Sequence, residues 1–344
     1  MKELNKLKDV QEIKIDPKRK LFSATHEEIS SGYTTDVYFL KTLDILESLD
    51  LADKTVTAEI FPRKSGIFCG LDEVLNLLKD KKIELWSIPE GESFEAKDTV
   101  MRIRGPYKEF AVFETVVLGI LASSSGWATA AFKCREAAGD KTFICFGSRH
   151  VHPAVAPVME RAAVIGGANG ASCILAAKLL NQNPLGTVPH AAFLIAGDTL
   201  TIAEAYDKVM PPESPRIILV DTFKDEVEET IRVARLLGKK LEGIRLDTPS
   251  ERGGVTPELV REVRARLDFE GYNHVKIFVS GGLDPERIKI LSENGADAFG
   301  VGSYISSAPP IDMTLDLKKV EDKPVAKRGR IPGLIENKKL KKFK

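Results

Sequence analysis

From about residue 140 onward, short apolar runs rich in β-branched residues alternate with segments of helical periodicity. The apolar runs are TFICF (142–146), RIILV (216–220), EGIRL (242–246), VKIFV (275–279) and DAFGV (297–301). The helical patterns cover residues 155–180, 200–210, 224–239, 256–269 and 285–295. Strands separated by helices in this way form βαβ units around a parallel sheet, and near-continuous apolar strands indicate a sheet covered on both faces. The alternation therefore predicts an α/β fold.

Two architectures fit this alternation. A doubly wound open sheet remains possible, and about six units are too few for a complete eight-stranded barrel. Polar residues follow almost every predicted strand, and in β/α barrels the active site is built at the carboxyl ends of the strands. We therefore expect an incomplete β/α barrel.

The residues before position 106 have a mixed pattern. A helix is expected at 35–49, extended runs at 54–61 and 82–88, and short strands in the turn-rich stretch 89–107. The apolar stretch 109–132 carries Glu114 and three serines, which indicates a buried helix rather than a membrane span. We expect an N-terminal α+β sandwich domain over 1–106, completed by 307–344, and the barrel over 107–306.

Composition limits the class of protein. Lys plus Arg equals Asp plus Glu, so the net charge is zero and gives no support for a nucleic-acid binder. The N-terminus lacks the apolar core of a signal peptide, so we expect a cytoplasmic protein without a membrane anchor. The four cysteines show no CxxC spacing, and no zinc is expected. The basic tail 323–344 could contact phosphate or form a solvated terminus.

Two glycine-containing loops follow the last two predicted strands. They are SGGLD, with Ser280, Gly281 and Gly282, and GVGS, with Gly302 and Ser303. Glycines let backbone N–H groups approach phosphate oxygens, and a following helix N-terminus adds a favourable dipole. In β/α barrels the loops after the last two strands often bind phosphate. The two loops together predict a phosphate site.

Carboxylates and cations follow the other strands. Asp221 and Asp247 are oxygen ligands of the type that Mg²⁺ prefers, although each could instead cap the next helix. Arg149 and Arg245 offer planar forks suited to carboxylate or phosphate. The set suits a phosphorylated sugar substrate with a metal ion.

Several stretches in this order resemble nicotinate phosphoribosyltransferases, which belong with the quinolinate enzymes to the type II phosphoribosyltransferases. They are SGYTTDVYFLKT, LLGILASSSGWATAA, FGSRHVHPAV, GGANGASCILAAKLLNQNPLGTVPHA, LVDTF, IRLDTPS, IFVSGGLD and GADAFGVGS, and they span about residues 31 to 306. The resemblance implies an N-terminal α/β sandwich and an incomplete α/β barrel. It also implies transfer of phosphoribose from phosphoribosyl pyrophosphate to nicotinate in NAD biosynthesis, with ATP as co-substrate and Mg²⁺. It further implies a homodimer or a trimer of dimers.

The resemblance also implies roles for particular residues. His190 matches a histidine that is phosphorylated by ATP, and it joins Asp221 and Asp247 as the expected catalytic set. The resemblance places Arg245 and Thr187 near nicotinate, Phe146 stacked on its ring, and Tyr33 reaching the site from a neighbouring subunit. Gly282 and Ser303 match phosphate-binding positions.

The sequence leaves the roles of two histidines undecided. His150 and His152 could assist pyrophosphate binding, or they could orient their loop by bonding to backbone carbonyls.

Three other functions also fit the sequence: a quinolinate phosphoribosyltransferase, a non-catalytic phosphoribose- or nucleotide-binding sensor, and an unrelated barrel aldolase or epimerase. An aldolase or epimerase would require a lysine at a strand end, and the polar residues that follow the predicted strands include none.

Overall fold

The computed structural model describes residues 2–344, which form two compact units. The first contains the chain up to Thr129 together with Pro309–Lys344, and the second is Ala130–Ala308. The division falls within the long helix α5 (Glu114–Ala138). The domain boundary predicted from the sequence, at residue 106, lies before this helix. Because α5 is one continuous helix, the sequence carries no break or turn signal at the point where the units divide.

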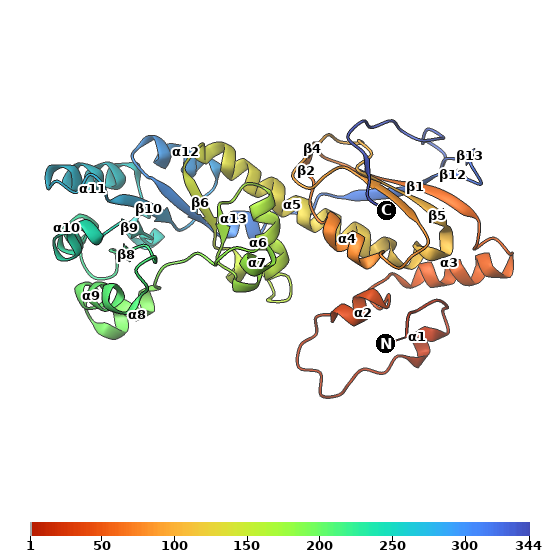
Figure 1. Ribbon diagram of the computed structural model, residues 1–344, viewed down its shortest axis with the longest axis horizontal. Helices are drawn as coiled ribbons and strands as arrows, with labels where there is room; N and C mark the ends of the chain where they lie inside the picture. The colour runs from red at the N-terminus through yellow and green to blue at the C-terminus, as the bar shows by residue number, and fades with distance from the viewer. Residues whose placement is uncertain (1) are drawn as a thin grey trace. The chain divides into compact units, whose positions relative to one another are not determined.

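The first unit is built on an antiparallel sheet of six strands (Figure 1). Its order is β13-β12-β1-β5-β3-β14, so the last part of the chain supplies both edges of the sheet. The strands are β1 (Thr55–Pro62), β3 (Glu84–Ser87), β5 (Met101–Pro106), β12 (Met313–Val320), β13 (Lys323–Pro324) and β14 (Lys341–Lys342). A two-stranded sheet, β2 (Gly66–Ile67) with β4 (Ser93–Phe94), accompanies it. The extended runs expected at 54–61 and 82–88 are confirmed.

Short helices surround this sheet. They are α1 (Asp9–Glu12), α2 (His26–Ser30), α3 (Val37–Ser48), α4 (Leu71–Leu77) and the 3₁₀ turns η1 (Tyr107–Glu109) and η2 (Ala111–Phe113). Leu40 of α3 and Val74 of α4 are buried in the same apolar core as Ile60 of β1 and Ile103 of β5. Helices α3 and α4 thus cover a face of the sheet (Figure 1).

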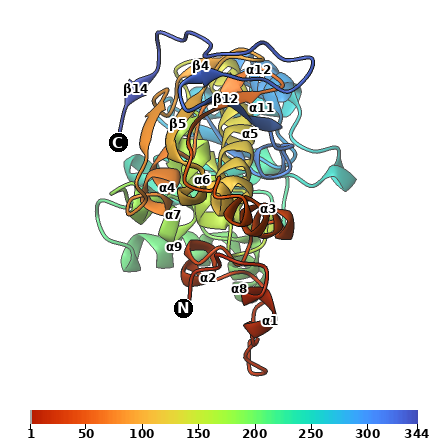
Figure 2. The ribbon, with the colours of Figure 1, turned by 90° about the vertical axis from the view of Figure 1, so that its right-hand side faces the viewer.

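The basic tail ends as part of the antiparallel sheet. Lys341 and Lys342 of β14 pair with β3, and Phe343 N donates to Leu85 O at 2.9 Å (Figure 2). The Lys344 ammonium donates to the carbonyl of Leu78 at 2.7 Å, at the end of α4. The basic tail is therefore largely exposed, as expected for a solvated terminus, and its last residues also pair with β3.

Helix α5 is the longest helix of the described chain. Its length and composition would allow it to cross a membrane, and about half of that segment is buried inside the protein. Val117 and Leu121 lie buried in the first unit, and Ala131 and Cys134 are buried in the second. This agrees with the expectation of a core helix.

The second unit contains a parallel sheet flanked by helices (Figure 1). Its strands are β6 (Thr142–Cys145), β7 (Gly170–Ala171), β8 (Ile217–Leu219), β9 (Gly243–Leu246), β10 (Lys276–Ser280) and β11 (Ala298–Val301). Its helices are α6 (Ala156–Ile165), α7 (Ile174–Leu179), α8 (His190–Ala196), α9 (Thr199–Val209), α10 (Glu226–Leu237), α11 (Pro257–Phe269), α12 (Pro285–Glu293) and α13 (Ser303–Ser306). Three 3₁₀ turns complete it: η3 (Ser148–His150), η4 (Gly238–Lys240) and η5 (Ser250–Arg252).

The strand order shows a barrel that fails to close on one side. The order is β7-β6-β11-β10-β9-β8, so the first strand of the unit pairs with the last, as in a closed barrel. The unclosed side lies between β7 and β8, where the segment 184–189 runs. Leu185 N donates to Ala171 O at 2.9 Å and so extends the β7 side of this opening. The expected incomplete β/α barrel is confirmed.

The helix expected over residues 155–180 is wrong as a single element. It divides into α6, the short strand β7 and α7. Gly167 has a φ of +112°, a conformation that side chains with a Cβ rarely adopt. A Cβ at Gly170 would come within 2.6 Å of Leu185. The glycines therefore end α6 and allow the segment 184–189 to pack on β7.

Candidate active site

Phe146 directly follows β6 and lies flat against the neighbouring strand β11. A Cβ at Gly300 would come within 2.4 Å of the Phe146 ring. The glycine therefore leaves the space in which the ring sits. The ring faces the barrel interior, where it can stack on a planar ligand.

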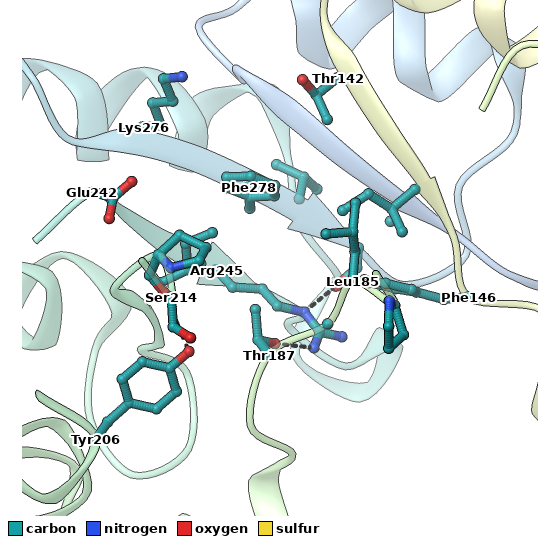
Figure 3. Close-up of a pocket in the computed structure, with 18 of the residues that line it drawn as sticks. Thr142, Phe146, Leu185, Thr187, Tyr206, Ser214, Glu242, Arg245, Lys276 and Phe278 are labelled. Carbon is teal, nitrogen blue, oxygen red and sulfur yellow. Dashed lines mark hydrogen bonds between the residues drawn. The ribbon is translucent and has the colours of Figure 1, made fainter. Parts of the chain in front are cut away.

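Arg245, which points inward from β9, is held by side chains from several strand ends (Figure 3). Its Nε donates to Ser280 Oγ at 2.9 Å, and its Nη1 donates to Thr187 Oγ1 at 2.8 Å. Its guanidinium carbon lies 5.4 Å from the centre of the Phe146 ring. The predicted nicotinate-binding residues of this unit thus lie together.

A pocket of about 450 Å³ fills the barrel interior beside these residues. Its wall includes the inward-facing side chains of Ile144, Ile217 and Phe278. Arg245, Thr187 and Phe146 lie at one end, and Glu242 and Lys276 lie at the other (Figure 3). Eight-stranded barrels normally fill this space with side chains, so the hollow follows from the missing strands and from glycine at 243 and 300.

His190 begins α8 and faces both predicted catalytic carboxylates. Its Nε2 lies 3.8 Å from Asp221 Oδ1 and 3.6 Å from Asp247 Oδ2. Its Nδ1 lies 3.2 Å from Thr222 Oγ1. The His190 side chain is 36% exposed, so a ligand can reach it from solvent.

Asp221 is buried, and only one of its oxygens is paired. Its Oδ2 accepts a hydrogen bond from the backbone N–H of Asp247, whereas Oδ1 has no hydrogen-bond partner among residues 2–344 and lies 3.8 Å from His190 Nε2. Burial raises the pKa of the Asp221 carboxyl, which the hydrogen bond from Asp247 and the nearby His190 partly oppose. Asp221 and Asp247 do not cap helices here, because Asp225 caps α10 and Thr256 caps α11.

The carboxylate pair fits a Mg²⁺ ion. The unpartnered Oδ1 of Asp221 and the Oδ2 of Asp247 both face His190, at the carboxyl ends of neighbouring strands. Within residues 2–344, no cluster of three or more His, Cys, Asp or Glu side chains could hold a metal. Mg²⁺ commonly takes one or two carboxylates and completes its shell with water and substrate phosphate. Asp221 and Asp247 would be its protein ligands.

The SGGLD loop follows β10 with two consecutive glycines at positive φ. Gly281 has φ +91° and Gly282 has φ +59°. A Cβ at Gly281 would come within 3.1 Å of Asp247 Oδ1, whereas a Cβ at Gly282 would have no neighbour within 4 Å among the described residues. The Ser280 hydroxyl accepts from Arg245 and donates to Asp247 Oδ1 at 2.8 Å. The loop thus joins the pocket to the carboxylates and exposes backbone at Gly282.

The GVGS loop lies against the loop that follows β6. A Cβ at Gly302 would come within 3.2 Å of His150 Nε2, and Ser303 begins α13. Arg149 is exposed beside them. Burial lowers the pKa of Arg245, and the charge of Arg149 makes a smaller contribution in the same direction. His152 Nδ1 accepts from Ala154 N at 3.1 Å, so it orients its loop through a backbone N–H rather than a carbonyl.

Tyr33 lies in the first unit. Its backbone N–H donates to Glu28 O at 2.9 Å, and its side chain packs on the apolar core of that unit. Its expected role across a subunit interface stays a prediction.

Sequence reasoning missed two buried glutamates that hold strand-end loops. Glu160 of α6 binds the loops after β6 and β7. Glu226, at the start of α10, accepts from Thr248 Oγ1 at 3.0 Å and from Arg252 Nη2 at 2.7 Å, both after β9. The sequence offers only a weak signal for Glu160, two charged residues within the apolar stretch VMERAAV, and none for Glu226, which lies in the highly charged stretch KDEVEETIR.

Comparison with known proteins places the chain in a family. Family models for the N-terminal and C-terminal domains of quinolinate phosphoribosyl transferase match residues 36–125 and 127–316. The crystal structure of a nicotinate-nucleotide pyrophosphorylase from Pyrococcus furiosus is similar, with a TM-score of 0.88 and 44% identity. That match covers 92% of this chain and 82% of the other. Human nicotinic acid phosphoribosyltransferase shares the fold, with a TM-score of 0.70 and 18% identity, over 88% of this chain and 77% of the other.

Curated relatives carry two kinds of name. A nicotinate phosphoribosyltransferase of Mycobacterium tuberculosis is 32% identical over 259 residues, 72% of this chain and 54% of the relative. A probable nicotinate-nucleotide pyrophosphorylase (carboxylating) of Archaeoglobus fulgidus is 25% identical over 267 residues, 76% of this chain and 94% of the relative. The chain spans about half the length of the nicotinate phosphoribosyltransferases it matches. With both domain models matched along most of its length, the chain belongs to the quinolinate phosphoribosyl transferase family.

Proposed function

We propose that this protein transfers phosphoribose from phosphoribosyl pyrophosphate to the ring nitrogen of nicotinate. The bond between the anomeric carbon and the pyrophosphate oxygen breaks, and pyrophosphate leaves with the electron pair. The pyridine nitrogen forms the new bond and gives nicotinate mononucleotide. Positive charge develops on the ribose, so the site's work is to hold both reactants in position and to balance phosphate charge.

The arrangement around Arg245 carries this proposal. The guanidinium is fixed by Ser280 and Thr187, and its Nη2 lies 3.4 Å from Asp247 Oδ2. Its remaining N–H groups can meet one substrate carboxylate, and Phe146 lies beside it to stack on an aromatic ring. Lys276 also lines the pocket, but it begins β10, at the opposite end of the strand from Ser280. One cation near the stacking face favours an acceptor with a single carboxylate.

Quinolinate is the competing acceptor. The two family models that match the chain are named for quinolinate phosphoribosyl transferase. A second ring carboxylate would need a further cation, and exposed Arg149 is the residue near Arg245 that could supply it.

An acceptor panel tests the proposal. The protein is incubated with phosphoribosyl pyrophosphate, Mg²⁺ and nicotinate, quinolinate or nicotinamide, with and without ATP, and nucleotide products are separated by chromatography. We expect nicotinate mononucleotide from nicotinate and little product from nicotinamide, because the amide brings no charge to the guanidinium and places an NH₂ group against its N–H donors. Faster turnover of quinolinate would assign the competing reaction, and equal turnover of nicotinamide would refute the role of Arg245.

We further propose that ATP phosphorylates His190 and that this step improves substrate binding. A neutral imidazole is nucleophilic near pH 7, and the partial exposure of His190 leaves it open to ATP. Mg-ATP should then leave an acid-labile, base-stable phosphate on the protein. His190→Ala should lose that label and the ATP hydrolysis while keeping slow ATP-independent transfer. A folded variant that still takes up the label would exclude His190 as the acceptor.

A further inference from the structure

We infer that Glu160 is a positioning residue that fixes Arg149 for the phosphate-bearing substrate. This inference rests on the proposed function. In it, Glu160 does not contact phosphoribosyl pyrophosphate itself but acts through Arg149. Glu160 lies on α6, behind the loops, and does not line the barrel pocket.

The Glu160 carboxylate is fully buried, with 0% exposure, and it accepts four hydrogen bonds. Oε1 accepts from Ser148 N at 3.0 Å, from Ser148 Oγ at 2.7 Å and from Ser172 Oγ at 2.9 Å. Oε2 accepts from Cys173 N at 2.6 Å. A buried carboxylate with this many donors is held in one orientation, and it holds its donors in turn.

These bonds reach two strand-end loops. Ser148 begins η3 and directly precedes Arg149, whereas Ser172 and Cys173 follow β7. The residue before Glu160 supports the same turn, because a Cβ at Gly147 would come within 2.6 Å of the Met159 side chain. Successive residues of α6 therefore fix the backbone that leads into Arg149.

Among residues 2–344, no group anchors the Arg149 side chain in a comparable way. Its side chain is exposed, and it carries positive charge close to the buried Arg245. The neighbouring His150 lies against Gly302, so η3 also borders the predicted phosphate loop after β11. The position of the Arg149 charge relative to the phosphate loops depends on where η3 is held, and Glu160 holds it.

Glu160→Gln is the informative substitution because it keeps the size of the side chain. Both carboxylate oxygens accept from backbone N–H groups, those of Ser148 and Cys173. A glutamine offers one oxygen and one NH₂ group, so one backbone donor must face another donor. The turn at Ser148 or the start of α7 then shifts. A displacement of this kind should raise the KM for phosphoribosyl pyrophosphate about tenfold.

A double-mutant cycle with Arg149→Ala separates positioning from general destabilisation. The KM values for phosphoribosyl pyrophosphate and for nicotinate are measured for the wild type, both single variants and the double variant. We expect Glu160→Gln to raise the KM for phosphoribosyl pyrophosphate and to leave that for nicotinate within about twofold, since Arg245 has separate anchors. In the Arg149→Ala background the effect of Glu160→Gln should nearly vanish.

Glu229→Gln is the matched control. Glu229 is a buried glutamate of the same unit whose Oε2 pairs with Arg232, also on α10, and whose Oε1 has no hydrogen-bond partner within residues 2–344. It should lower the unfolding temperature without changing either KM. If Glu160→Gln does not fold, Ser148→Ala takes its place in the cycle, because it removes the hydroxyl bond to Glu160 and keeps the carboxylate.

Additive effects of the two substitutions, or an equal rise in both KM values, would overturn the inference. A wild type that makes no nucleotide from phosphoribosyl pyrophosphate would instead refute the proposed function. The two failures are therefore distinguishable.

Discussion

Two buried carboxylates, one in each unit, differ in how completely they are paired. Glu59 of β1 has 0% exposure and accepts from Arg102 Nε at 2.9 Å, from Arg102 Nη2 at 2.6 Å and from Thr99 Oγ1 at 3.3 Å. It also accepts from the backbone N–H of Ile335, in the C-terminal segment, at 3.2 Å. The Asp221 side chain is 1% exposed, and its Oδ1 has no hydrogen-bond partner within residues 2–344.

An unpaired buried oxygen does not by itself mark a functional charge, because Oε1 of the buried Glu229 also has no hydrogen-bond partner within residues 2–344. Asp221 differs because its unpaired oxygen faces His190, which also faces the carboxylate of Asp247. A buried charge is costly unless it is paired and hydrogen-bonded, and Glu59 meets this condition within the protein. Asp221 meets it only in part, so folding alone does not account for a carboxylate at this position. An oxygen that faces His190 without a partner is available to a ligand, and perturbed carboxylates of this kind cluster at functional sites.

The largest expected effect is on activity, from Asp221→Asn. The substitution keeps the shape of the side chain and removes the charge that would hold Mg²⁺ and face His190. We expect nucleotide formation to fall by about 10²–10³-fold, as for loss of a preorganised electrostatic group. Steady-state kinetics at saturating Mg²⁺ measure the loss, and full activity in the variant would place the metal elsewhere.

Glu59→Gln should lower the stability of the protein and leave its activity unchanged. It leaves the Arg102 charge, which is 18% exposed, without its counter-charge, at a cost of about 3 kcal/mol in the free energy of unfolding. Denaturant unfolding gives this value, and kcat/KM measured on the folded fraction should stay unchanged. A loss of activity without a loss of stability would contradict the structural role.

The pH dependence of stability should differ between wild type and Asp221→Asn. Because burial raises the folded pKa of Asp221 above the ordinary value of 3.8, the folded state holds this proton more tightly than the unfolded state. The favourable contribution is complete below pH 3.8 and is lost as the pH rises through the folded pKa. The unfolding temperature of the wild type relative to the variant should therefore fall with rising pH and then level off. A constant difference across the range would mean that Asp221 is not perturbed.

The smallest expected difference is between substitutions of two glycines, one in each unit. A Cβ at Gly105 of β5 would come within 2.8 Å of Lys82 O, so Gly105→Ala should disturb packing alone. Gly282→Val meets open space but at a φ of +59°, with a cost of about 1 kcal/mol or more in stability. It should also block backbone approach and raise the KM for phosphoribosyl pyrophosphate about five- to tenfold. An unchanged KM in folded Gly282→Val would move the phosphate contact to another loop.

The periodicity of the sequence was enough to predict the barrel and the edge at which its polar residues gather. Each of β6, β8, β9, β10 and β11 lies within an apolar run followed by polar or glycine residues. The break at Gly167 was missed, because 155–180 keeps its apolar pattern through the glycines and β7 has only two residues. A helical period alone does not reveal such a short strand.

Contacts distant in sequence were beyond the reach of local patterns. Ile335 bonds to Glu59 across 276 residues, and the end of the tail pairs with β3 while its lysines stay exposed. Nothing local to the sequence distinguished Glu160 from the adjacent Arg161, since the donors of Glu160 lie on two separate loops. Strand ends could be predicted locally, whereas the groups that hold them require the fold.

The most direct test of the account compares wild type, Asp221→Asn and Glu59→Gln in a single assay. Each protein is shown to be folded at the assay temperature and is then given nicotinate, phosphoribosyl pyrophosphate, Mg²⁺ and ATP, and nicotinate mononucleotide is quantified over time. The account predicts product from the wild type and from Glu59→Gln, and almost none from Asp221→Asn. Absence of product from the wild type, or equal rates from wild type and Asp221→Asn, would contradict it.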